Sequence, residues 1–134
     1  MFESEPRVQL KYRRLWQTIG GVLILLVIYL SLTPAPVAIP LAEGDKYGHM
    51  GAYATLMLWF ALIYRLPTAR LAWALAFSAM GMTLECLQGL TSYRTFDLAD
   101  VAANILGIFI GWLLAPPRLP HALEFLETRV ISRI

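Results

Sequence analysis

The sequence predicts an all-α protein, an integral membrane four-helix bundle with a short C-terminal amphipathic helix. Of the 134 residues, 58% are hydrophobic and only 15% are charged, whereas a soluble domain is about 45–50% apolar and about 25% charged. A chain of this size buries too small a share of its surface to hide so much apolar area from water. The apolar residues fall in four stretches, each of about 20 residues, the length that crosses a bilayer.

Prolines mark where several of these stretches begin or end. Pro34 and Pro36 follow the first stretch. Pro67 opens the third, where a first-turn proline suits a helix, and Pro116 stops the fourth, because proline cannot continue a helix. The predicted spans cover residues 15–32, 46–64, 67–88 and 95–115.

These spans form one predicted membrane domain, residues 15–115, between a basic N-terminus (1–14) and a tail (116–134). A basic start followed by an apolar core also fits a signal peptide, cleaved near Ile39. The core is long for a signal peptide, so we expect an uncleaved span.

The positions of Lys and Arg orient the predicted spans. Nine of the 11 precede the first span, flank the connection between the second and third, or follow the fourth. Only Lys46 and Arg94 fall on the other side. Because cytoplasmic loops carry an excess of Lys and Arg, we expect a multi-pass protein of the cytoplasmic (inner) membrane with both termini in the cytoplasm.

After Pro120 the pattern becomes that of a short amphipathic helix on the inner membrane surface. A plain solvated tail is the alternative. The apolar face consists of Leu123, Leu126 and Val130, and the charged face of Glu124, Glu127 and Arg129.

Polar residues that are out of place in lipid form one stripe on each of three spans, because they recur three or four residues apart. With the orientation above, all three stripes lie on the extracytoplasmic side, around a wet pocket in the outer leaflet. Arg94 lies in the outer loop beside them. The second span carries Asp45, Lys46, His49 and Tyr53, the third Ser78, Gly81, Glu85 and Gln88, and the fourth Asp97, Asp100, Asn104, Gly107 and Gly111.

Some of these residues also have ordinary structural explanations. Asp97 suits the first turn of a helix through the helix dipole, and Asp45 is a plausible helix cap. Tyr53 could be a buried aromatic, and Gly107 with Gly111 forms a GxxxG pattern typical of helix packing. Capping does not explain the groups deeper in the spans, Glu85, Gln88, Asp100 and Asn104.

The order of these residues resembles the VanZ-like family, small bacterial membrane proteins named for a teicoplanin-resistance protein. The resemblance covers residues 45–111 and implies a four-span protein of the cell envelope. The founding member is associated with resistance to a glycopeptide that acts outside the cytoplasmic membrane. The motif reads Asp45-Lys46-x-x-His49-x-x-x-Tyr53, Glu85-x-x-Gln88 and Arg94-x-x-Asp97-x-x-Asp100-x-x-x-Asn104-x-x-Gly107-x-x-x-Gly111.

The leading functional hypothesis is a pocket that binds, and in one version modifies, the head group of a membrane lipid or a lipid-linked envelope precursor. Lys46 and Arg94 would hold an anionic group. The stripes carry four carboxylates, Asp45, Glu85, Asp97 and Asp100, against these two cations. Carboxylates that lie close together relieve their repulsion by protonation, by pairing with a basic group or by binding a cation. The predicted ligand-binding residues are Asp45, Lys46, Tyr53, Gln88, Arg94, Asp97 and Asn104.

A catalytic version would use His49, Glu85 and Asp100 as acid and base, or Glu85, Asp97 and Asp100 as oxygen ligands of Mg²⁺ or Ca²⁺. No obvious nucleophile accompanies them.

Three further readings remain open at this point. One is a proton- or ion-coupled transporter component, which the carboxylates and the histidine would suit. Another is a purely structural role, and the third is assembly into a homo-oligomer. The net charge of +2, without a basic run interleaved with aromatics, argues against nucleic acid as a partner. The single cysteine, Cys86, cannot form an internal disulfide, which excludes a disulfide scaffold.

Overall fold

A computed structural model of the chain describes residues 10–34, 44–116 and 121–134, without the side chains of residues 44 and 45. These residues form five α-helices, one 3-10 helix and no β-strand. The all-α prediction is therefore confirmed. The elements are α1 (Arg13–Leu32), α2 (Gly44–Ile63), α3 (Pro67–Leu90), α4 (Leu98–Leu114), α5 (Ala122–Arg129) and the 3-10 helix η1 (Ile131–Arg133).

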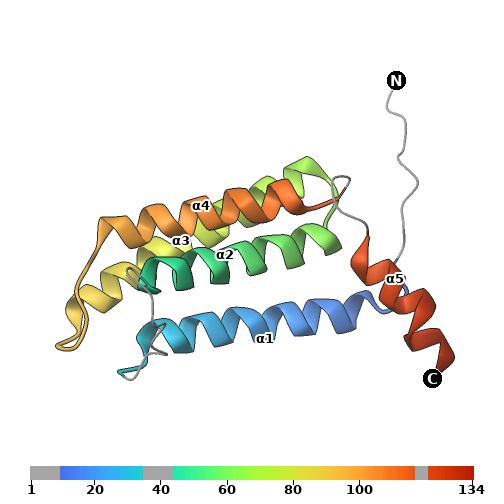
Figure 1. The fold of residues 1–134 in the computed structure, drawn as a ribbon, viewed down its shortest axis with the longest axis horizontal. Helices are drawn as coiled ribbons and strands as arrows, with labels where there is room; N and C mark the ends of the chain where they lie inside the picture. Colours follow the sequence, from blue (N-terminus) through green and yellow to red (C-terminus); the bar gives the residue numbers. More distant parts are fainter. Residues whose placement is uncertain (1–9, 35–43, 117–120) are drawn as a thin grey trace.

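The helices α1 to α4 lie side by side and alternate in direction (Figure 1). α1 and α3 finish, and α2 and α4 begin, at one end of the bundle, which we call the loop end. α5 crosses the opposite end, which we call the α5 end. The central element is α2, which contacts each of the other α-helices and packs most extensively against α4.

One face of α2 supplies most of the apolar core. Tyr53, Leu56, Met57 and Phe60 recur at helical spacing and are almost fully buried. Toward the α5 end the core becomes aromatic, because Phe60 packs against Trp73 of α3 with ring centroids 4.2 Å apart. Because apolar side chains fill the middle of the bundle, the buried polar side chains lie toward its two ends.

Two glycines of α4 allow its close approach to α2. A Cβ atom on Gly107 would collide with the carbonyl oxygen of Met50, and one on Gly111 with the carbonyl oxygen of Ala54. The GxxxG pattern therefore packs helices, as expected for small residues four apart. This contact sets the position of the first turns of α4 beside those of α2, where the polar stripes lie.

Large apolar side chains also cover much of the exterior. Val22, Leu25 and Tyr29 of α1, and Ile105 and Phe109 of α4, are each more than half exposed. By length and composition, α1 and α3 are suited to cross a membrane, and α4 is apolar but shorter. Among the described residues, two of the four predicted spans therefore meet this test.

At the α5 end, Glu127 of α5 caps the N-terminus of α1. Its carboxylate accepts hydrogen bonds from the backbone N–H groups of Lys11 and Tyr12, both at 2.9 Å, and from Trp16 Nε1 at 2.6 Å. The two backbone donors are of the kind that a helix start leaves unsatisfied, and the third is the indole N–H of Trp16. Burial alone would raise the pKa of Glu127, and these hydrogen bonds more than offset it, so that its pKa lies below the ordinary value.

The faces of α5 consequently differ from the predicted ones. Leu123 is buried as expected, but Glu127, predicted on the charged face, is buried beside it. Leu126 and Val130, predicted to be on the apolar face, are exposed. The helix is rotated because its carboxylate binds the start of α1.

At the same end, Arg70 in the first turn of α3 binds the C-terminal ends of two helices. Its guanidinium donates to the carbonyl oxygens of Tyr64 at 3.0 Å, Ala61 at 2.8 Å and Pro116 at 2.8 Å. These carbonyls follow or belong to the last turns of α2 and α4, which lack helical partners. A buried arginine thus joins the ends of two helices.

Candidate functional site

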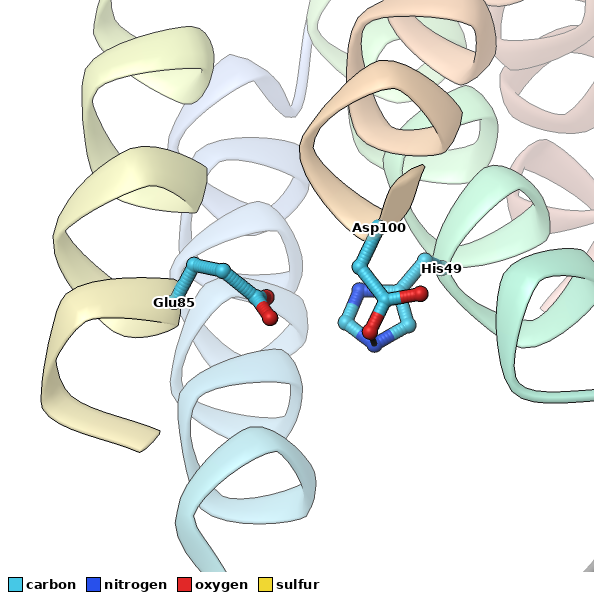
Figure 2. A group of neighbouring side chains, drawn as sticks. All are labelled: His49, Glu85 and Asp100. Carbon is cyan, nitrogen blue, oxygen red and sulfur yellow. Dashed lines mark ion pairs between the residues drawn. The ribbon is translucent and has the colours of Figure 1, made fainter. Parts of the chain in front are cut away.

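Three titratable side chains from three helices meet at the loop end. His49 extends from α2, Glu85 from α3 and Asp100 from the first turn of α4, and the Glu85 carboxylate points toward the other two (Figure 2). One ligand atom of each lies within 4.8 Å of the others. Glu85 is 1% exposed. We call His49, Glu85 and Asp100 the acid–histidine cluster.

Asn104 fixes the orientation of the histidine ring. His49 Nδ1 lies 2.9 Å from Asn104 Oδ1, and an amide oxygen can only accept a hydrogen bond. Nδ1 must therefore carry a proton and donate it to Asn104. The other ring nitrogen, Nε2, faces Asp100 Oδ2 at 3.8 Å, so it is the atom that the ring offers to the cluster.

Glu85 and Asp97 together shape the start of α4. The backbone N–H of Asp97 donates to Glu85 Oε1 at 3.0 Å. The Asp97 side chain accepts the N–H of Ala99 at 2.8 Å, as a helix N-cap does. This cap explains why α4 begins at Leu98, later than the predicted start near residue 95. The structure thus uses the Asp97 carboxylate as a cap and places His49, rather than Asp97, with Glu85 and Asp100.

Tyr53 and Asn104 form the inner floor of the cluster, and both are 2% exposed. Gly81 of α3 makes room for them, because a Cβ atom there would lie 2.9 Å from Asn104 Nδ2 and 3.2 Å from the Tyr53 hydroxyl. Three helices therefore meet closely beneath the acid–histidine cluster. Both floor residues belong to the predicted ligand-binding set.

Two other predicted ligand-binding residues, Gln88 and Arg94, contact the end of α1 instead of the cluster. Together with Tyr93, they bind carbonyl oxygens that a helix C-terminus leaves unsatisfied. Arg94 also places a positive charge at the negative end of the helix dipole. The donors and acceptors are Gln88 Nε2 to Ser31 at 2.6 Å, Tyr93 Oη to Leu32 at 2.8 Å and Arg94 Nη2 to Leu30 at 3.2 Å.

The remaining predicted residues, Asp45 and Lys46, fall in the first turn of α2 at the same end. Lys46 is half-buried, and the Asp45 side chain lies outside the described residues. Sequence reasoning missed the capping roles of Tyr93, Arg70 and Glu127. The position of Arg70, a charged residue in the first turn of an apolar stretch, could have indicated a contact with helix ends. Nothing distinguished Glu127 from the other charged residues of the tail.

The fold and the site define a small helical-bundle protein with a buried cluster of one imidazole and two carboxylates at one end. The chain belongs to the VanZ/LLP1 family, whose model matches residues 23–120. The match contains the whole acid–histidine cluster and ends before α5. The family resemblance of the polar motif is therefore confirmed.

A curated relative has also been found, an uncharacterised protein of the fission yeast Schizosaccharomyces pombe. It is 33% identical over 96 residues, which are 69% of this chain and 57% of the relative. The chain therefore spans little more than half the length of this relative. No solved structure matches the chain.

Proposed function

We propose that this protein is a multi-pass protein of the cytoplasmic membrane with its loop end in the outer leaflet and its termini in the cytoplasm. The exposed apolar side chains of α1, α3 and α4 would contact lipid, since soluble proteins rarely expose apolar patches of this extent. Two of these helices are suited to cross a membrane, which supports the proposal.

The basic residues support the same orientation, because an excess of Lys and Arg favours the cytoplasmic side. Among the described residues, only Lys46 and Arg94 belong to the loop end. Arg7 and Arg118, part of the predicted excess, lie outside the described residues. The basic residues of the α5 end are Lys11, Arg13, Arg14, Arg65, Arg70, Arg129 and Arg133.

At the loop end, the protein would bind the polar head of a lipid or a lipid-linked envelope precursor. The observation that carries this proposal is the acid–histidine cluster, three titratable groups within 4.8 Å at a bundle end that also holds Lys46 and Arg94. Arg94 uses Nη2 to bind α1, and a guanidinium has five N–H groups. It can therefore hold α1 and still donate to an anionic head group.

The bundle interior favours binding over proton or ion transport. Below Tyr53 and Asn104, the core consists of apolar side chains such as Met57, Phe60 and Phe77. The described residues therefore provide no continuous polar path from the loop end to the α5 end, which a relay would need.

Native mass spectrometry of the protein released from mild detergent tests the proposal. We expect a discrete lipid adduct on the unaltered chain that is lost in Glu85→Gln and Asp100→Asn. The matched control is Glu124→Gln, which neutralises a carboxylate at the α5 end, 3.7 Å from Arg65, and should retain the adduct. Equal lipid spectra for all four proteins would overturn the head-group proposal.

If the head group belongs to a cell-wall precursor, binding would also alter tolerance to glycopeptides that act on the outer surface. The comparison of drug susceptibility between cells that express the native chain and cells that express Asp100→Asn tests this consequence. Equal susceptibility would remove glycopeptide tolerance from the proposed function and leave lipid binding to be judged by its own experiment.

A further inference from the structure

We propose that the acid–histidine cluster binds one divalent metal ion of intermediate hardness, such as Mn²⁺ or Zn²⁺. The inference goes beyond head-group binding, because it stands on three side chains and requires neither a lipid nor a bilayer. The ligand atoms would be His49 Nε2 and one or both oxygens of Glu85 and Asp100. All three side chains are more than four-fifths buried, and they come from three different helices.

The histidine is oriented as a metal ligand is. Metal-binding histidines usually donate their second ring N–H to an oxygen acceptor, which fixes the ring and directs the other nitrogen to the ion. His49 donates Nδ1–H to Asn104 at 2.9 Å, and the buried position of Asn104 holds this acceptor in place. Nε2 is left 3.8 Å from Asp100, longer than a direct hydrogen bond.

The surroundings of the Glu85 carboxylate also point to a bound cation. A carboxylate offers about four lone-pair sites, and the described residues supply Glu85 with one N–H donor, from Asp97. Glu127, at the other end of the bundle, accepts three N–H donors. A buried carboxylate that faces another carboxylate with so few donors has a strong demand for a cation.

The donor set determines the class of metal. A site of oxygens alone, as expected from Glu85, Asp97 and Asp100, would suit Mg²⁺ or Ca²⁺. In the structure the third ligand is the imidazole of His49 and not the carboxylate of Asp97. A set of one nitrogen and two carboxylates favours metal ions that accept both nitrogen and oxygen ligands. Bonds of about 2.0–2.2 Å would draw the three atoms closer than their present separation, and side-chain rotation can supply this movement. Three protein ligands leave coordination positions for water or an oxygen of a bound anion.

The experiment measures metal binding on the full chain in detergent. After removal of metal with a chelator, Mn²⁺ is titrated and counted by electron paramagnetic resonance, and Zn²⁺ is added in competition. We expect one Mn²⁺ per chain, displaced by Zn²⁺, and at least tenfold weaker binding in His49→Gln, Glu85→Gln and Asp100→Asn.

The matched control is Asp97→Asn, because asparagine is also a good N-cap and the Asp97 carboxylate lies in the same turn. It should bind Mn²⁺ as the native chain does. Equal loss in Asp97→Asn would overturn the proposed ligand set and restore the oxygen-only site. Failure of the native chain to bind Mn²⁺ or Zn²⁺ stoichiometrically would overturn the metal site altogether.

Two further measurements keep these outcomes separate from folding and from lipid binding. Circular dichroism establishes that each variant is helical, and Zn²⁺ should raise the melting temperature of the native chain but not that of His49→Gln. Native mass spectrometry of the metal-free protein reports the lipid adduct independently. An adduct on a chain that binds no metal would overturn the metal site alone. Metal binding without an adduct, on the metal-free and the Mn²⁺-loaded protein alike, would overturn head-group binding alone.

Discussion

The two ends of the bundle both bury charged side chains, but they satisfy them differently. At the α5 end, Glu127 accepts three N–H groups at the start of α1, and Arg70 donates to three carbonyl oxygens at the ends of α2 and α4. At the loop end, His49, Glu85 and Asp100 face one another.

This difference separates architecture from function. A buried charge whose hydrogen bonds are supplied by helix ends stabilises the fold, because those backbone groups would otherwise lack partners. Buried titratable groups from different helices that face one another mark a candidate site, because environments of this kind are arranged where proteins bind ions or perform chemistry. Substitutions at the α5 end should therefore lower the stability of the chain and leave metal binding unchanged. Substitutions in the acid–histidine cluster should weaken metal binding and change stability little.

The largest effect on stability is expected from Arg70→Met. The substitution keeps an unbranched side chain but removes the guanidinium that donates to three carbonyl oxygens. A buried hydrogen-bonding group left without its partner costs about 1–3 kcal/mol, so the loss of three such contacts together should exceed the loss of any single one. Thermal unfolding in detergent, followed by circular dichroism, measures the loss.

Mn²⁺ affinity, measured below the melting transition, should be unchanged in Arg70→Met, because the cluster lies at the other end of the bundle. A variant with native stability would show that the arginine contacts contribute little. A folded variant that loses its Mn²⁺ affinity would show that the two ends are coupled.

A smaller loss is expected from Glu127→Gln. Both oxygens of Glu127 accept N–H donors, and an amide can present only one oxygen. Its NH₂ group would therefore face a backbone N–H, and a buried donor left unsatisfied costs about 1–3 kcal/mol. Unfolding of Glu127→Gln and the native chain at pH 7 measures this difference.

The pH dependence of stability provides a second test of the same contact. Because the pKa of Glu127 is lower in the folded chain than its ordinary value of 4.5, its contribution is present above that value and is lost as the pH falls through the lowered folded-state pKa. The native chain and Glu127→Gln should therefore converge in stability in acid. A constant gap between them from pH 7 to pH 3 would contradict the contact.

The helices were predictable from the sequence because their signals are local. Apolar stretches and prolines placed the first helix at 15–32 and the second at 46–64, and the structure has Arg13–Leu32 and Gly44–Ile63. The convergence of His49, Glu85 and Asp100 also followed from helical spacing and alternating direction. These inferences require only the period of a helix and the order of the elements.

The division of the polar residues between site and scaffold was not predictable. Gln88 and Arg94 share the loop end with the cluster, but their donors reach carbonyl oxygens of α1. That contact depends on how α1 packs against α3, and every residue has a carbonyl, so the α1 sequence carries no sign of it. The same reason hides Glu127, whose partners are two backbone N–H groups and the Trp16 indole.

The smallest effect on stability, and the sharpest comparison, is expected from Glu85→Gln, the same substitution at the loop end. The amide oxygen can still accept the Asp97 N–H that Glu85 Oε1 accepts, and the NH₂ group can donate toward Asp100 in the cluster. The change also removes a negative charge from a buried pair of carboxylates, which relieves repulsion.

We therefore expect the free energy of unfolding of metal-free Glu85→Gln to lie within about 1 kcal/mol of that of the metal-free native chain, or above it. Added Mn²⁺ should stabilise the native chain alone, since only a bound ligand shifts the unfolding equilibrium. If Glu85→Gln instead destabilises the metal-free chain as much as Glu127→Gln does, both ends of the bundle are architecture, and the polar residues of the loop end hold the helices together.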